Sequence, residues 1–179
     1  MKIEELMTRR VVACRPDTDL AHVARLMWEN DCGCVPVVDA EDRVVGVVTD
    51  RDICMGAQFQ GRSLGELRTN ACMASTVTTC RPDDTVESVV RLMGSKRVRR
   101  IPVTDAGGRL LGIVSMGDFV DAAAGSGKGA KGLQEALLEG LAGIYQRPAR
   151  EEIVPQAPPS SRVERNAPAR RREKKRAKK

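Results

Sequence analysis

Cys14-Arg15-Pro16-Asp17 recurs 66 residues later as Cys80-Arg81-Pro82-Asp83, and the correspondence continues without a gap. Residues 14–52 and 80–118 are identical at 16 of 39 positions. A match of this length indicates one supersecondary unit used twice, and two such copies pack most simply about a pseudo-two-fold axis. The fold of this part of the chain therefore depends on one unit and its repetition.

Each copy is expected to form a β-α-β-β-α unit. Short strands are predicted at 11–14 and 77–80, because each proline biases its neighbour toward extended backbone. Apolar residues at helical spacing follow, and Thr18 and Asp84 stand where helix caps belong. The rest of each unit is two strands and a short helix. In the first copy the strands are expected at 34–39 and 43–49, with a helix from about Asp50. In the second copy they are expected at 100–105 and 109–115, with a helix from about Met116.

The fold class is predicted as α+β, with tandem repeats followed by a helix and a tail. The expected segments are repeat 1 at 1–62, repeat 2 at 63–124 with a linking helix at 64–73, a Gly-rich break and amphipathic helix at 125–146, and a disordered basic tail at 147–179. The apolar stripe of the helix at 133–145 must be buried, either on its own domain or against a partner.

Composition excludes some classes of protein. The 179 residues include 41% hydrophobic but only 2% aromatic residues, so the core is aliphatic and platforms for stacking single-stranded bases are scarce. No apolar run approaches the roughly 20 residues that cross a bilayer, and acids occupy the start of the chain where a signal peptide is apolar. We therefore expect a cytoplasmic protein with no membrane span.

The positive charge is concentrated in the tail. Residues 147–179 contain 12 Lys/Arg and 4 Asp/Glu, which gives this segment a net charge of +8. Residues 1–146 contain 18 Lys/Arg and 20 Asp/Glu, which gives them a net charge of −2. The final ten residues, 170–179, carry 8 bases and one acid. Such a run either binds nucleic acid or anionic lipid by counterion release, or simply keeps the protein soluble.

Both copies end in Gly-h-h-[Thr/Ser]-x-x-Asp, where h is apolar: Gly46 to Asp52 and Gly112 to Asp118. A hydroxyl followed three residues later by an acid is a helix capping box, which is a structural role. The same hydroxyl and the helix amides can also meet a phosphate, while the acid accepts hydrogen bonds from a ribose diol. One helix end can serve both purposes.

With these endings and the prolines that precede them, at Gly33-Cys34-Val35-Pro36 and Arg99-Arg100-Ile101-Pro102, the sequence resembles a cystathionine-β-synthase (CBS) domain pair, or Bateman module. The resemblance covers roughly residues 1–124. It implies a regulatory module with two clefts that bind AMP, ATP or S-adenosylmethionine as ligands, with no cofactor required. Its partner is then a second copy, in a disc-shaped homodimer, or a separate enzyme or transporter. The resemblance also implies which residues contact the ligand. Asp52 and Asp118 would bind ribose, and Thr49 and Ser115 would bind ribose or phosphate. Main-chain groups near Val12 and Thr78 would bind adenine.

The two copies differ at charged positions. Arg99 and Arg100 replace Gly33 and Cys34, and Arg51 has no counterpart in the second copy. Because alternate strand residues point to opposite faces, only one of Arg99 and Arg100 is expected to face a given cleft. Arg51 and Arg100 are therefore the predicted phosphate ligands, with a solvated charge or an ion pair as the alternative. One cleft can be occupied while the other is vestigial.

Six cysteines offer a second hypothesis, a thiol or metal sensor that uses Cys32 and Cys34. No Cys-x-x-Cys pair occurs, and the single histidine, His22, lies in a predicted helix, so buried apolar cysteines are favoured and no metal ligand is assigned. No nucleophile-base arrangement or Gly-rich phosphate loop is present, which predicts a binding module rather than an enzyme. A nucleic-acid adaptor acting through 170–179 is the third hypothesis.

Overall fold

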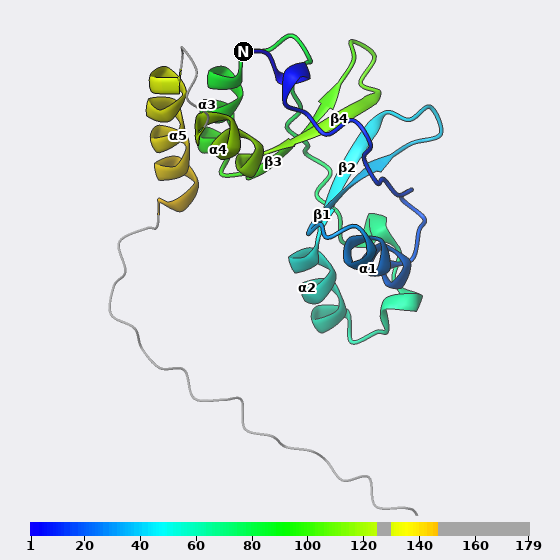
Figure 1. The fold of residues 1–179 in the computed structure, drawn as a ribbon. Helices are drawn as coiled ribbons and strands as arrows, with labels where there is room; N and C mark the ends of the chain where they lie inside the picture. Colours follow the sequence, from blue (N-terminus) through cyan, green and yellow to red (C-terminus); the bar gives the residue numbers. More distant parts are fainter. Residues whose placement is uncertain (125–129, 147–179) are drawn as a thin grey trace, which may run out of the picture. The chain divides into compact units, whose positions relative to one another are not determined.

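The structure is a computed structural model that describes residues 1–124 and 130–146 (Figure 1). The glycine-rich break and the basic tail lie outside these residues. The elements, in chain order, are α1 (Leu20–Glu29), β1 (Cys34–Val38), β2 (Val44–Thr49), α2 (Asp50–Gln60), α3 (Val86–Lys96), β3 (Arg100–Thr104), β4 (Leu110–Ser115), α4 (Met116–Ala124) and α5 (Ala130–Tyr145). The predicted mixed α+β class and the repeated order of elements are confirmed.

Each repeat forms a two-stranded antiparallel sheet, β1–β2 or β3–β4, with the same register and the same irregularity near its end. The strands predicted at 11–14 and 77–80 are each present only as a single parallel bridge. Cys14 pairs with Val37, and Cys80 pairs with Val103. Cys14 N–H donates to Pro36 O at 3.1 Å, and Cys80 N–H donates to Pro102 O at 3.1 Å. Val38 N–H donates back to Cys14 O, and Thr104 N–H donates back to Cys80 O, both at 2.9 Å. Pro16 and Pro82 have no N–H, so neither ladder can continue to the next bond.

The helix caps lie one residue later than predicted. Asp19 caps α1 by accepting from His22 N–H, and Thr85 caps α3 by accepting from Ser88 N–H. Thr18 and Asp84 instead accept from the backbone N–H of Arg15 and Arg81, at 3.0 and 2.7 Å. These side chains close the turn before the helix, a role that Thr and Asp fill because their short side chains reach nearby amides.

The predicted linking helix at 64–73 is wrong, since this segment contains two 3-10 turns, Leu64–Glu66 and Thr69–Ala71. Its backbone joins the first repeat: Ala74 and Val47 exchange both hydrogen bonds, at 2.9 and 3.0 Å. The start of the chain, with the short 3-10 turn Ile3–Glu5, joins the second repeat in the same way, since Thr8 and Ile113 exchange bonds of 2.9 and 3.0 Å. Each repeat is thus completed by the segment that precedes the other repeat.

The repeated glycines make this exchange possible. A Cβ on Gly46 would lie 2.5 Å from Met73 Sδ, and a Cβ on Gly112 would lie 2.8 Å from Met7 Sδ. Real Cβ atoms do not approach so closely, so only glycine lets each methionine pack across the strand. The glycine of the repeated motif therefore has a packing role in both copies.

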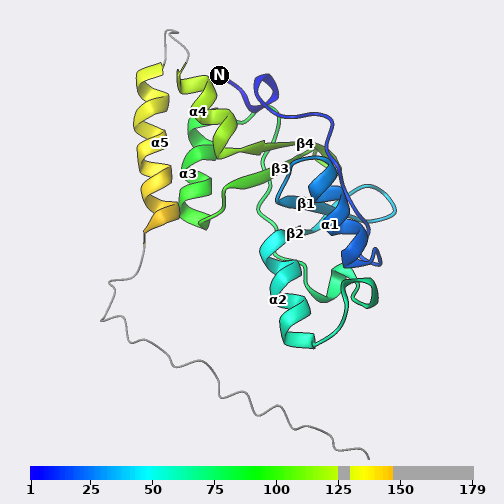
Figure 2. The same ribbon diagram turned by 60° about the horizontal axis from the view of Figure 1, so that its bottom comes forward.

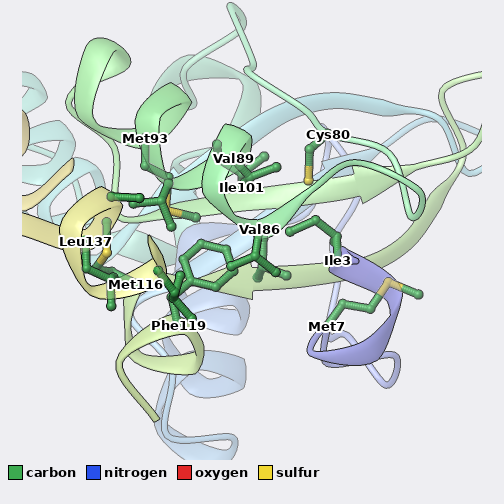
Figure 3. Close-up of a cluster of buried hydrophobic side chains, with 14 of the residues drawn as sticks. Ile3, Met7, Cys80, Val86, Val89, Met93, Ile101, Met116, Phe119 and Leu137 are labelled. Atoms are coloured by element: carbon green, nitrogen blue, oxygen red, sulfur yellow. The ribbon is translucent and has the colours of Figure 1, made fainter. Parts of the chain in front are cut away.

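The second repeat has the larger hydrophobic core. Phe119, Met93 and Ile101 are fully buried there, together with Ile3 from the N-terminal segment (Figure 3). Helix α5 adds Leu133, which is 3% exposed, and its neighbours to this core. Figures 1 and 2 both show α5 beside α3 and α4. Of the two alternatives for its apolar stripe, packing on its own domain is the one realised.

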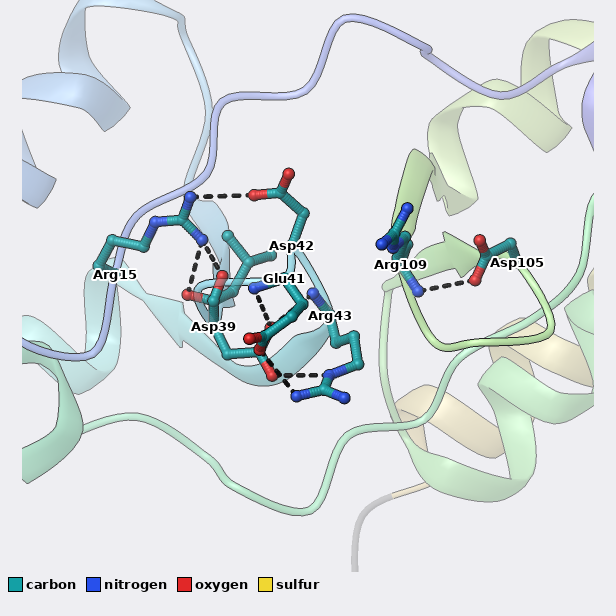
Figure 4. A network of polar contacts seen from close by, with 8 residues as sticks. Arg15, Asp39, Glu41, Asp42, Arg43, Asp105 and Arg109 are labelled. Carbon is teal, nitrogen blue, oxygen red and sulfur yellow. Dashed lines mark hydrogen bonds and ion pairs between the residues drawn. The ribbon is translucent and has the colours of Figure 1, made fainter.

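Polar contacts brace the turns between paired strands. Arg15 bonds to Asp42 Oδ1 at 2.9 Å and also donates to the carbonyl of Asp39, while Arg43 pairs with the Asp39 and Glu41 carboxylates at 2.8 Å (Figure 4). The two turns also meet, since Val44 N–H donates to Gly108 O and Leu110 N–H donates to Asp42 O, both at 3.0 Å. These bonds join the two repeats at one edge.

None of the helices within residues 1–124 and 130–146 has the length and apolar character that crossing a membrane requires.

Candidate ligand-binding cleft

A cleft of about 1370 Å³ opens beside the first repeat. Its polar end is formed by the chain entering β1, by the β2–α2 junction and by the chain entering β3 from the other repeat. Its apolar end continues between α1 and α2. The lining residues at the polar end are Asp31, Cys32, Gly33, Cys34, Thr49, Asp50, Arg51, Arg97, Val98, Arg99 and Arg100.

Two equivalent turns bring the repeats together at this cleft. Asp31 follows α1 with a φ of 48°, and Arg97 follows α3 with a φ of 55°. Left-handed backbone at a helix C-terminus turns the chain sharply, and it is uncommon for residues other than glycine. The turns direct 31–34 and 97–100 into the same cleft, one segment carrying an acid and the other three arginines.

Thr49 and Asp52 form the predicted capping box at the start of α2. Asp52 Oδ2 accepts from Thr49 N–H at 2.9 Å and from Thr49 Oγ1 at 2.7 Å, and Asp52 N–H donates back to the hydroxyl at 3.3 Å. Asp52 Oδ1 has no hydrogen-bond partner among the described residues. Both side chains are half-buried, and the bonds to Thr49 hold the Asp52 carboxylate in place.

The second repeat has the same capping geometry. Asp118 Oδ2 accepts from Ser115 N–H at 2.7 Å and from Ser115 Oγ at 2.8 Å. Its surroundings differ, because Asp50 and Arg51 are replaced by Met116, which is 7% exposed and part of the core, and by Gly117. The capping role is therefore shared, but the cation of the first repeat has no counterpart here.

Four arginines line the cleft against two acids, Asp31 and Asp50, a net charge of +2. These arginines are Arg51, Arg97, Arg99 and Arg100, and all are exposed. Within the described part of the chain, none of them forms an ion pair or donates a side-chain hydrogen bond. Guanidinium groups bind phosphate through paired N–H donors, so the chemistry of this lining suits an anion better than a cation.

The cleft gathers only part of the predicted site. Thr49, Arg51 and Arg100 line it, and Asp52 lies one hydrogen bond behind Thr49. The other predicted residues, Ser115, Asp118, Val12 and Thr78, do not line it; all four are half-buried elsewhere in the two repeats.

The expectation that only one of Arg99 and Arg100 faces a given cleft is wrong. Both line this cleft, because β3 begins at Arg100 and Arg99 lies before it, outside the alternation of the strand. Sequence reasoning also missed Arg97 and Asp31. The signal was present, since 31–34 and 97–100 occupy the same place in the two repeats and have opposite charge.

The thiols in the cleft bear on the alternative of a thiol or metal sensor. Within residues 1–124 and 130–146 no three His, Cys, Asp or Glu side chains cluster closely enough to hold an ion. Burial raises the pKa of the Cys34 thiol to about 11, although Arg100 acts in the opposite direction. A thiol with such a pKa stays protonated at neutral pH and is a poor nucleophile.

Comparison with known proteins assigns both repeats to one protein family. The model of the CBS domain family matches residues 3–56 and 65–125. Protein MK0525 of Methanopyrus kandleri is 32% identical over 120 residues, 67% of this chain and 61% of that protein. The CBS domain-containing protein YhcV of Bacillus subtilis is 31% identical over 117 residues, 65% of this chain and 81% of YhcV.

Among solved structures, CBSX2 in complex with AMP superposes with a TM-score of 0.61 at 28% identity, covering 68% of this chain and 95% of CBSX2. The matched residues contain both Gly-h-h-[Thr/Ser]-x-x-Asp endings and both chain segments that enter the cleft. The family match, the relatives and the fold agree, and the resemblance inferred from the repeated motifs is confirmed: this chain belongs to the CBS domain family.

Proposed function

We propose that the cleft beside the first repeat binds a phosphorylated adenosine, and that the chain is a regulatory module rather than an enzyme. The observation that carries this proposal is the set of four arginines next to the Thr49–Asp52 capping box, none of which pairs with another residue that the structure describes. Asp52 Oδ1, which has no partner among the described residues, would accept from the ribose diol. Thr49 would bond to ribose or phosphate, and the guanidinium groups would hold the phosphate. The AMP complex of CBSX2 supports the choice of ligand class.

The net charge of the cleft favours some adenosine ligands over others. AMP and ATP carry phosphate, whereas S-adenosylmethionine carries a positive sulfonium that four nearby guanidinium groups repel. We therefore expect nucleotides to bind at least ~10-fold more tightly than S-adenosylmethionine, a difference of about 1.4 kcal/mol.

Regulation would follow from the position of the cleft. Its lining comes from both repeats, with Thr49 and Arg51 from the first and Arg97 to Arg100 from the second. A ligand that contacts both repeats favours the mutual orientation that it binds more tightly, and a partner that contacts both repeats would detect this change.

Thermal unfolding with and without AMP tests the proposal. AMP at about 100 times its dissociation constant should stabilise the native chain by about 2.7 kcal/mol. Asp52→Ala should weaken binding roughly 10-fold or more, because it removes a charged hydrogen-bond acceptor. Asp118→Ala is the matched control, since it removes the same capping interaction from the other repeat.

Each variant is compared with its own ligand-free melting temperature, which separates binding from loss of the cap. Absence of any AMP-dependent shift in the native chain would contradict the ligand class. Loss of the shift in Asp118→Ala with a normal shift in Asp52→Ala would place the site in the other repeat.

A further inference from the structure

Trp28 is a large apolar residue that the core of the first repeat does not use. Helix α1 buries Leu20, Val23 and Met27 in that core. Trp28 follows Met27, so it lies about 100° farther round the helix, and its side chain is 88% exposed. Among the described residues, this is the most exposed of the large hydrophobic side chains. The indole is therefore offered at the surface.

This surface belongs to the cleft, close to its polar end. Trp28 lines the cleft, and its backbone O accepts from Asp31 N–H at 3.4 Å. Two residues later, Gly33 O accepts from Asp50 N–H at 3.3 Å, at the start of α2. A Cβ on Gly33 would lie 3.0 Å from Asp50 Oδ2, so this segment lies directly against the start of α2. Short backbone contacts thus connect Trp28 to the helix end that carries the capping box.

The apolar end of the cleft offers a flat ring a place beside the indole. The residues that line this end with Trp28 are Ala24, Ile53 and Ala57. Ala24 precedes Trp28 by one helical turn on the same face of α1, and its side chain is only a methyl group. Nucleic-acid bases bind to aromatic side chains by stacking, because every base has a π-face. This end therefore suits a base, as the arginines suit a phosphate.

The base is the one part of the proposed nucleotide that has no assigned contact in this cleft. The arginines account for the phosphate, and the capping box accounts for the ribose. The predicted contacts of adenine, near Val12 and Thr78, do not line the cleft. A base bound here needs another partner, and Trp28 is the aromatic residue of the described lining.

The second repeat has no equivalent platform. Under the 66-residue repeat, the position of Trp28 is occupied by Gly94. A Cβ on Gly94 would lie 2.9 Å from Gly140 Cα, because α5 packs closely over this part of α3. The indole of the first repeat and the closed surface of the second repeat make the two copies different where a base would stack.

We propose that the base of the bound nucleotide stacks on the indole of Trp28, and that the first repeat alone provides this platform. The inference rests on the proposed function, because it assigns the base of the same ligand. The nucleotide then lies with its phosphate among the arginines, its ribose at the capping box and its base over the end of α1.

The experiment uses the full chain and two measurements of AMP binding. Calorimetry gives the affinity, and fluorescence reports the base directly, because Trp28 is the single tryptophan. AMP should quench this fluorescence along the same binding curve and protect the indole from acrylamide. Ribose 5-phosphate, which has no base, should leave the fluorescence unchanged. Trp28→Ala should weaken AMP binding at least about fivefold, and Trp28→Phe should stay within about threefold of the native affinity.

Phe59→Ala is the matched control, because Phe59 is 79% exposed on α2 and does not line the cleft. Its AMP affinity should stay within about twofold of the native value. AMP binding with unchanged fluorescence, or with native affinity in Trp28→Ala, would overturn this inference and leave the proposed function standing. An indole that acrylamide cannot reach before AMP is added would also overturn it, since the platform would already be covered. Absence of AMP binding by calorimetry would overturn both.

Discussion

Replacing both Arg99 and Arg100 by glutamate should weaken AMP binding by at least about 100-fold, since each lost charge-assisted bond contributes about 1.5–3 kcal/mol. Both side chains line the cleft and neither is paired with another described residue, so the change removes two free guanidinium groups and adds two repelling carboxylates. Calorimetric titration of the double variant with AMP measures the effect.

The matched control for this variant is Arg10→Glu combined with Lys96→Glu. Arg10 and Lys96 are exposed and do not line the cleft, yet the double substitution alters the net charge of the chain by the same amount. Its AMP affinity should stay within about threefold of the native value, because exposed charges outside the site are screened by salt. Equal losses in the two double variants would mean that overall charge, and not this cleft, attracts the nucleotide.

Gly94→Leu should lower the free energy of unfolding by about 3 kcal/mol or more. No room exists for a side chain here, because a Cβ would already meet Gly140 at 2.9 Å. Helix α5 must move away, which exposes Leu133 and Leu137, and each fully buried leucine contributes about 1.5–3 kcal/mol. Urea unfolding measures the change.

Gly132→Leu is the control for the same substitution on α5. A Cβ at Gly132 meets no atom within 4 Å, so leucine fits without strain and improves the helix propensity. This variant should be as stable as the native chain or up to about 1 kcal/mol more stable. A Gly94→Leu variant with the stability of Gly132→Leu would show that α5 does not pack on α3 as described.

The repeat made the local structure predictable. Apolar spacing located α1 and α3 to within a residue or two, and the turn residues located the paired strands, because these signals are local and occur twice. The single bridges at Cys14 and Cys80 were predicted as strands, since sequence shows extended backbone but not whether a partner strand continues beside it.

The exchange of segments between repeats was not predictable in the same way. Only Met7 and Met73 signal that 1–8 and 67–74 are equivalent, and nothing local shows that each packs on the other repeat. The position of α5 likewise depends on Gly94, Gly140 and Gly143 meeting in space, and isolated glycines in helices are usually only weak points.

Sequence identified some of the residues that line the cleft but not the extent of the cleft. The capping boxes at Thr49 and Ser115 and the cations Arg51 and Arg100 were identified from residue types and spacing. Sequence could not show that Asp31 and Arg97 take left-handed backbone and bring both repeats into one cleft, because this conformation is decided by packing around each turn.

The central claim is that a phosphorylated adenosine binds where the two repeats meet beside the first capping box. Titrating AMP into the ¹⁵N-labelled chain while recording backbone amide spectra tests it residue by residue. We predict that the amides of 31–34, 49–52 and 97–100 shift together along one saturable binding curve. Shifts confined to 77–79 and 115–118, or spectra unchanged at millimolar AMP, would contradict it.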